Sequence, residues 1–295
     1  ELPGVLGAKA PLQNSADLRA KGWEISLDWN DRIGNVQYYL GFNLYDSRTK
    51  ITKYDNEVGL LGKDSDDNLI YRKGMELGEI WGYTTDRLYT TEDFDSQGKL
   101  KNNIPKVEGY NPKPGDILYV DFDGNGIINN GKNTSNEPGD TRIIGNDTRR
   151  YQYGIRGGTT WKGISLSFIL QGVGKRDLWL MNELFYPHYD VTGEKTGTKQ
   201  FSELKAGDFV PVIGPLGNGF PYEKAEGNTK ANQKPQTRFL QNGAYLSIRN
   251  ISLSYTFPIK LIKPLGITNL SVFFSGENLF TFDHLPKGID AERVV

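Results

Sequence analysis

Oxygen-bearing side chains alternate along one short Asp- and Gly-rich run of the sequence, DFDGNG at 121–126. Alternating oxygens with a glycine at the sharp bend are typical of the first half of a calcium-binding loop. These residue types predict a site for Ca²⁺ or Mg²⁺, because both ions prefer oxygen ligands. The candidate ligands are the side chains of Asp121, Asp123, Asn125 and Asn129 and the main-chain carbonyl of Ile127.

The same run departs from a complete calcium loop at its last position. Lys132 stands where a bidentate acid is expected. A bound ion should therefore be weakly held and structural, shaping the loop, and no cofactor is required. A turn rich in Asp and Gly explains the same residues without a metal. Both interpretations stay open at this point.

Aromatic residues are frequent in the segment 175–238. Rings that project from a loop can stack on sugars or peptides, or can bury against a partner protein. Such residues more often pack a loop onto itself, so this alternative stays beside the first. The rings predicted to contact cargo or a lid protein are those of Trp179, Phe185, Tyr186 and Tyr189.

Composition excludes several classes of function. The 295 residues include 35 Lys+Arg against 36 Asp+Glu, no Cys, and only two His, His188 and His284. The balanced charge gives no basic field for nucleic acid, and the missing thiols and scarce imidazoles exclude a Cys nucleophile and disfavour a His-based metal centre. No pattern raises a hydrolase with paired carboxylates above background, so we predict that the chain is not an enzyme.

Period-two alternation of apolar and polar residues marks the elements that must hold these groups. In the first of them, four apolar residues from Trp23 to Trp29 alternate with four polar residues from Glu24 to Asn30. The pattern predicts an all-β fold of antiparallel strands. The six predicted strands are 22–30, 36–46, 151–161, 164–174, 239–257 and 269–281.

The connections between these strands fall into two classes. Those within each hairpin are short, whereas 47–150 and 175–238 are long and hold much of the Gly, Pro, Asn and Asp. Short turns on one side and long loops on the other are typical of a transmembrane β-barrel with short periplasmic turns and long extracellular loops. Six strands are too few to close such a barrel, so we expect the chain to be part of something larger.

Several motifs, in this order, resemble the SusC/RagA-like TonB-dependent outer-membrane transporters of Bacteroidetes. Individually they are loose, and together they extend from one end of the chain to the other. The matching segments are 12–26, 79–85 (EIWGYTT), 114–126 with its DFDGNG run, 140–146 (DTRIIGN), 151–172, 238–255 (RFLQNGAYLSIRNISLSY), 272–280 (VFFSGENLF) and 288–290.

The resemblance implies that the chain is the C-terminal part of such a barrel, about its last third, located in the outer membrane. The plug domain, the segment that contacts TonB and the closing strand would lie outside this sequence. In the family, a SusD-like surface lipoprotein caps the barrel, and the TonB complex drives import of an oligosaccharide or an oligopeptide. The expected partners are therefore that lid, the TonB complex, the cargo and outer-membrane lipid.

Two other classes of protein compete with this interpretation. A soluble β-sandwich that binds glycans through exposed aromatics would also contain alternating strands. An enzyme of the outer surface would need clustered acids in a cleft. Apolar strand faces that meet lipid would distinguish the transporter from the sandwich, in which two stacked sheets bury the same side chains.

Overall fold

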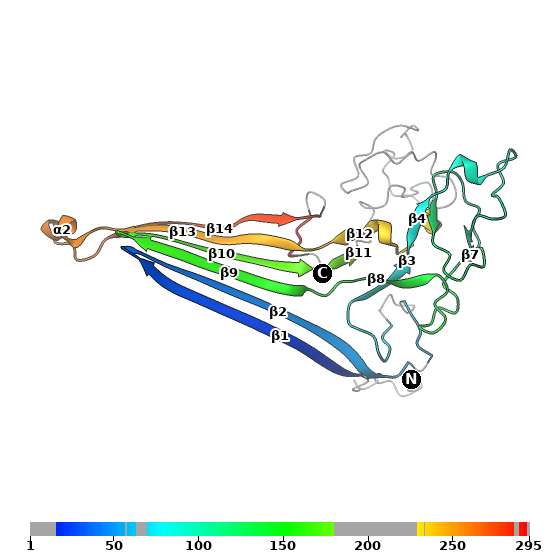
Figure 1. Cartoon of the computed structure of the whole chain (residues 1–295), viewed down its shortest axis with the longest axis horizontal. Helices are drawn as coiled ribbons and strands as arrows, with labels where there is room; N and C mark the ends of the chain where they lie inside the picture. The colour runs from blue at the N-terminus through cyan, green and yellow to red at the C-terminus, as the bar shows by residue number, and fades with distance from the viewer. Residues whose placement is uncertain are drawn as a thin grey trace, which may run out of the picture.

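One long antiparallel sheet is the largest structural unit of the described residues (Figure 1). The computed structural model describes residues 16–56, 58–62, 70–179, 229–232, 234–285 and 289–293. The sheet has six strands in the order β1-β2-β9-β10-β13-β14, and each strand is antiparallel to its neighbours. The strands are β1 (Ala16–Ile33), β2 (Val36–Tyr54), β9 (Arg150–Trp161), β10 (Ile164–Lys175), β13 (Tyr245–Thr256) and β14 (Ser271–Asp283).

The strand register sorts side chains into an apolar face and a polar face. Leu27 lies opposite Phe42, and Leu253 lies opposite both Leu166 and Phe274. Many side chains of the apolar face are exposed, including Trp29 at 62% and Phe274 at 76%. Among the described residues, no second sheet packs over this face. The fold is the expected antiparallel portion of a transmembrane β-barrel, open at β1 and β14, and the soluble β-sandwich interpretation is wrong.

Tight turns join the strands at one end of the sheet. Gly34 (φ 61°) follows β1, and Lys162 (φ 47°) with Gly163 (φ 87°) joins β9 to β10. Two consecutive positive φ angles define the hairpin turn whose twist matches that of the strands it joins. The predicted asymmetry between short turns and long connections is therefore a feature of the fold.

The observed strand bounds differ from the predicted ones where the alternating pattern fades. β1 and β2 continue well beyond 22–30 and 36–46, with pairs reaching Ala16–Tyr54, although polar residues occupy both faces there. The predicted strand 239–257 is interrupted, because β12 (Leu240–Asn242) leaves the main sheet to pair with β11 (Asp177–Trp179). The predicted strand 269–281 is shifted to Ser271–Asp283.

The two long connections fold together at the other end of the sheet. The described residues of the first connection contain three small pairs of strands, of which two are antiparallel and one is parallel. We call residues 70–147 together with 229–242 the loop domain, as far as they are described. Its remaining elements are β3 (Glu79–Tyr83), β4 (Thr85–Leu88), β5 (Lys106–Val107), β6 (Ile117–Tyr119), β7 (Ile127–Ile128), β8 (Thr141–Asn146) and α1 (Thr229–Asn232).

Helices contribute little to the described part of the chain. α1 and α2 (Ile259–Ile262) have four residues each, and the other helical segments are single 3-10 turns. None of these helices has the length and hydropathy that a membrane-crossing helix needs.

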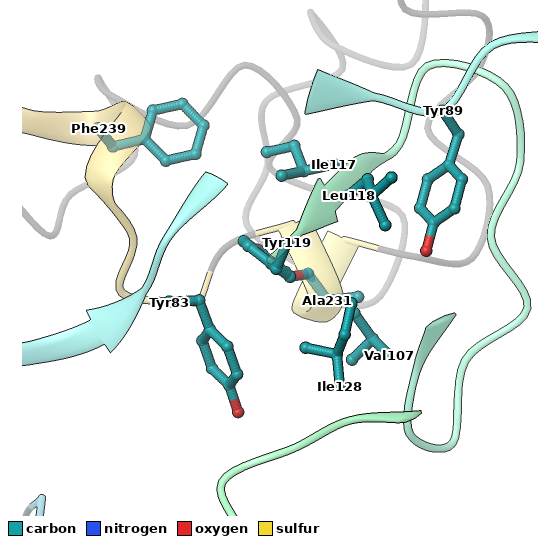
Figure 2. Packing of buried hydrophobic residues seen from close by; sticks show 9 residues of the cluster. All are labelled: Tyr83, Tyr89, Val107, Ile117, Leu118, Tyr119, Ile128, Ala231 and Phe239. Carbon is teal, nitrogen blue, oxygen red and sulfur yellow. The ribbon is translucent and has the colours of Figure 1, made fainter. Parts of the chain in front are cut away.

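The main buried apolar cluster lies in the loop domain and not in the sheet. Figure 2 shows side chains of β6 packed between residues that come from both long connections. Burial raises the pKa of Tyr83 to about 12, as expected for a phenol shielded from water. The cluster consists of Tyr83, Tyr89, Val107, Ile117, Leu118, Tyr119, Ile128, Ala231 and Phe239.

Candidate functional site

The polar face of the sheet carries charged side chains that face away from the apolar face. Asp28 on β1 and Arg156 on β9 form an ion pair of 2.7 Å between carboxylate and guanidinium, and both side chains are exposed. Gly41 on the intervening strand β2 makes room for this contact, because a Cβ there would lie 2.6 Å from Arg156 Nε. The pair thus bridges two strands across a third.

A second polar group lies farther along the same face, at an irregularity in β13. The register shifts between Ile248 and Asn250, which places Arg249 in a bulge. Its guanidinium donates to Gln171 and to the side chain of Asn278, both at 3.1 Å, and forms an ion pair of 2.7 Å with Glu292. We call Asp28, Arg156, Gln171, Arg249 and Asn278 the polar wall.

The described C-terminal residues 289–293 pack onto the end of the polar wall. Ala291 is fully buried in a small apolar cluster with Val173, Leu178 and Tyr245. Glu292 then reaches Arg249, and the hydroxyl of Ser247 donates to its carboxylate. The segment after β14 is therefore fixed to the sheet by both apolar and charged contacts.

A buried ion pair joins β2 to β9 at the end of the sheet where the loop domain begins. Arg150, the first residue of β9, donates to both carboxylate oxygens of Asp46 on β2. Both side chains are less than 10% exposed, and Glu76 lies 3.7 Å from the same guanidinium. Bidentate pairing is the strong geometry for Arg and a carboxylate, so this contact fixes the position at which the loop domain leaves the sheet.

The second long connection is held to the first by side-chain amides. The Gln236 amide is fully buried, donates to Tyr119 OH at 3.0 Å and accepts from Thr85 Oγ1 at 2.9 Å. Asn232 accepts from the backbone N–H of Ile117 at 2.9 Å. Backbone groups add to the contact, since Tyr83 N–H donates to the Pro235 carbonyl at 2.8 Å.

Three carboxylates converge in the loop domain at the predicted metal loop. Their ligand atoms all lie within 4.8 Å of one another. Two of them, Asp121 and Asp123, are among the predicted ligands, and the third, Asp140, is fully buried and comes from the start of the DTRIIGN motif. Asp140 thus supplies a third carboxylate from outside the loop sequence. Within the loop sequence, Lys132 stands where a calcium loop has its bidentate acid.

Each of these carboxylates also organises the backbone of the loop. Asp140 accepts from Phe122 N–H at 2.8 Å and from Asn129 N–H at 2.9 Å. Asp121 accepts from two glycine N–H groups, both at 2.7 Å. A carboxylate has about four acceptor positions, so these bonds leave room for a cation. The three groups form a hard-oxygen donor set, which fits Ca²⁺ or Mg²⁺ in type.

The other predicted side-chain ligands use their amide oxygens in local turns, and the amide nitrogen of Asn125 donates to the Asp123 carboxylate at 2.9 Å. The amide oxygen of Asn125 accepts from Ile127 N–H at 2.7 Å, and that of Asn129 accepts from Gly131 N–H at 2.8 Å. Ile127 lies in β7, beside Lys106 of β5. These bonds are the local turns that Asn side chains commonly make.

The predicted aromatic contacts are only partly covered by the structure. Trp179 lies in β11 and packs against Phe239, with ring centroids 6.3 Å apart. Phe185, Tyr186 and Tyr189 lie outside the described residues, as does His188. His284 is exposed just after β14.

Because of another buried carboxylate, that of Asp93, we expect the stability of the loop domain to fall at acidic pH. Arg87 donates to both oxygens of Asp93, the N–H of Thr90 adds a third bond, and together they lower the Asp93 pKa to about 2. Because the Asp93 pKa is lower in the folded protein than its unfolded value of 3.8, the charged carboxylate stabilises the fold fully at pH values above 3.8. This stabilisation is lost as the pH falls through about 2. We expect about 1–2 kcal/mol, since Arg87 is partly exposed.

This dependence is measurable by thermal unfolding of the full-length protein between pH 6 and pH 2. Asp93→Asn should lose stability at pH 6 and show a flatter profile below pH 4 than the parent. Asp86→Asn is the matched control, because its carboxylate is exposed and lies 4.0 Å from the same Arg87. Parallel profiles for the parent and Asp93→Asn would contradict the prediction.

Sequence reasoning missed Asp46, Gln236 and the role of Asp140. Their partners lie far along the chain, as in the 104 residues between Asp46 and Arg150. A local pattern does not record such distances. The signal in the sequence was that Asp140 begins the DTRIIGN motif, one of the segments that resemble SusC/RagA-like transporters.

Comparison with known proteins extends the similarity over the whole chain. No family model matches the sequence. TonB-dependent receptor P3 of Formosa agariphila is 23% identical over 300 residues, which cover 99% of this chain and 27% of the relative. TonB-dependent receptor P26 of the same organism is 24% identical over 288 residues, covering 94% and 26%. The chain spans about a quarter of the length of these curated relatives.

Solved structures with the same fold are described as a peptide transporter. The structure of the RagAB peptide transporter aligns with a TM-score of 0.60 and 16% identity, covering 99% of this chain and 28% of that one. The RagAB peptide importer in its open-open state aligns with a TM-score of 0.58 at the same identity. The relatives and neighbours are named receptors, transporters or importers, and none of these names denotes an enzyme.

Proposed function

We propose that this chain, which is similar in sequence to TonB-dependent receptors and in fold to the RagAB peptide transporter, forms barrel wall and extracellular loops of a SusC/RagA-like outer-membrane nutrient importer. The observation that carries the proposal is the two-faced sheet, with an exposed apolar face on one side and the polar wall on the other. Side chains such as Trp29 and Phe274 would meet lipid, and the polar wall would line the aqueous interior. The loop domain would stand on the extracellular side.

The cargo that fits this proposal is an oligopeptide or an oligosaccharide. An oligopeptide is favoured because the fold neighbour is named a peptide transporter and because the polar wall offers both signs of charge. The Asp28 carboxylate suits an amino terminus and the Arg249 guanidinium suits a carboxylate. A SusD-like lipoprotein would cap the loop domain, and the TonB complex would act through a plug region outside this sequence.

Transport is tested in cells that carry the full-length protein. Uptake of labelled oligopeptides or oligosaccharides should require the gene and an intact proton gradient. Replacing both Asp28 and Arg249 by Ala should reduce uptake of the cargo while the protein stays in the outer membrane. Lys99→Ala, a change of an exposed lysine of the loop domain, serves as the control. Recovery of the protein in the aqueous fraction without detergent would overturn the proposal.

We also propose that Asp121, Asp123 and Asp140 hold a structural divalent cation. The support is the convergence of three carboxylates. Three carboxylates without a closing bidentate acid suggest a dissociation constant of about 1 mM, which is within the range of extracellular calcium modules. At 5 mM Ca²⁺ the loop domain should then gain about 1 kcal/mol of stability.

The cation is tested by thermal unfolding with and without Ca²⁺. Asp123→Asn removes an exposed ligand and should abolish the stabilisation by Ca²⁺ while changing the stability of the metal-free protein little. Asp95→Asn, which also changes an exposed turn carboxylate of the loop domain, should keep the full response. Identical responses from the parent and Asp123→Asn would exclude the site.

A further inference from the structure

The connection between β13 and β14 is an ordered segment with unusual exposure. Residues 257–270 include α2 and a 3-10 turn, at the end of the sheet opposite the loop domain (Figure 1). Ile262 is only 3% exposed and anchors the segment, and Leu261 N–H donates to the Pro258 carbonyl at 2.9 Å. In contrast, Ile259, Leu261 and Leu265 are 57%, 65% and 73% exposed. A fixed turn thus presents three apolar side chains to its surroundings.

Lysines accompany these apolar side chains. Lys260 and Lys263 are exposed in the same segment, and the sequence of 257–270 contains no Asp or Glu. A third lysine, Lys162, lies in the adjacent hairpin turn, which is tied to the segment because Thr256 N–H donates to the Gly163 carbonyl at 2.8 Å. The Lys162 ammonium lies 5.0 Å from the centre of the exposed Trp161 ring.

The segment also continues the apolar face of the sheet. Trp161, Ile164, Tyr255 and Val272 pair in one row across the four strands next to these turns. The ring of Tyr255 packs against Phe257 with centroids 4.8 Å apart. Moving from the sheet to the turns, the surface changes from apolar and aromatic side chains to apolar side chains interspersed with lysines. This order of side chains matches the order of layers in a membrane, from acyl chains to headgroups.

We propose that segment 257–270 and Lys162 form a binding site for anionic phospholipid headgroups in the periplasmic leaflet of the membrane. The orientation rests on the proposed function, because it places the short turns in the periplasm. Ile259, Leu261 and Leu265 enter the boundary between acyl chains and headgroups. Lys162, Lys260 and Lys263 pair with the phosphates, as lysines near a negatively charged surface do.

Lipid binding to the full-length transporter in detergent tests the charged half of the site. Dioleoyl phosphatidylglycerol is titrated and the bound molecules are counted by native mass spectrometry, with dioleoyl phosphatidylcholine as the neutral probe. Replacing Lys162, Lys260 and Lys263 together by Gln should weaken binding of the anionic lipid by at least tenfold, given about fivefold per lysine. Binding of phosphatidylcholine should not change.

The control variant replaces three exposed lysines of the loop domain, Lys99, Lys106 and Lys113, by Gln. It should bind phosphatidylglycerol like the parent. The proposal would be overturned if both triple variants bound phosphatidylglycerol equally. It would also be overturned if the variant of Lys162, Lys260 and Lys263 lost a co-purifying periplasmic protein but still bound the lipid like the parent. Failure of the proposed function has a separate signature. In that case the parent itself would not insert into liposomes or show the heat-dependent gel mobility of a closed barrel.

Fluorescence quenching tests the apolar half of the site. The emission of Trp161 is the part of the tryptophan fluorescence that disappears in Trp161→Phe. In vesicles, phospholipids brominated near the headgroup should quench this emission more than lipids brominated near the chain end. Leu261→Asp should reduce the headgroup-level quenching of Trp161. Absence of quenching by either lipid would place the turn in water and overturn the proposal.

Discussion

Arg150→Ala should loosen the end of the sheet where the loop domain begins, because it leaves the Asp46 carboxylate buried without its partner and removes the guanidinium that lies 3.7 Å from Glu76 of the loop domain. Breaking a buried ion pair by removing one member costs about 3–5 kcal/mol. Both groups are nearly inaccessible and their contact is bidentate. Backbone amides in 76–90 and 141–150 of the full-length protein should therefore exchange with deuterium at least a hundredfold faster, because opening of the junction becomes easier.

Two variants show whether this effect comes from the buried charge. Arg48→Ala removes an exposed guanidinium 3.4 Å from Glu76 at the same junction and should cost less than about 1 kcal/mol. Replacing both members, Asp46→Leu with Arg150→Met, should restore most of the lost protection, because no unpaired charge stays buried. Unchanged exchange in Arg150→Ala would show that other contacts hold the junction.

Gln236→Ala should separate the two long connections. The change removes a fully buried amide, leaves the Thr85 hydroxyl without its acceptor and opens a cavity beside Tyr119. Unsatisfied buried polar groups cost about 1–3 kcal/mol each, so we expect a loss of about 3 kcal/mol. Amides in 231–242 and 81–88 should then exchange faster together, because the two segments share this contact.

The matched control is Gln97→Ala, which changes an exposed glutamine of the same loop domain and should leave exchange unchanged. Gln236→Glu is a sharper variant, since it keeps the size of the side chain. It also loses the amide donor that now reaches the carbonyl of Asn232. It should destabilise nearly as much as Gln236→Ala. Faster exchange in 231–242 alone would contradict the shared contact.

The sheet could be predicted from the sequence because its signal is local. From Trp23 to Asn30, each residue alternates between the two faces, and the partner strand from Val36 does the same. Predicted bounds are less accurate where polar residues occupy both faces, as in the outer parts of β1 and β2. The break at Gly243 also had no local signal, because its N–H donates to the Arg176 carbonyl in another part of the chain.

The loop domain could not be predicted in the same way. Strands such as β5 and β7 have two residues each, which is too short for any period to be recognised. The contacts that organise it, such as Ile117 with Asn232, join residues 115 positions apart. The predicted metal loop illustrates both cases, since Asp121 and Asp123 follow a local pattern and Asp140 joins them only through folding.

The single apolar cluster shared by the two long connections has a consequence for how such proteins diverge. Ala231 and Phe239 come from one connection, whereas Ile117 and Tyr119 come from the other (Figure 2). A chimaera that inherits only one of the two segments from a relative would carry half of a matched interior. Recombination between relatives should therefore give a folded protein when both segments are inherited together from the same parent. Point substitutions in one segment should likewise be accompanied by compensating substitutions in the other.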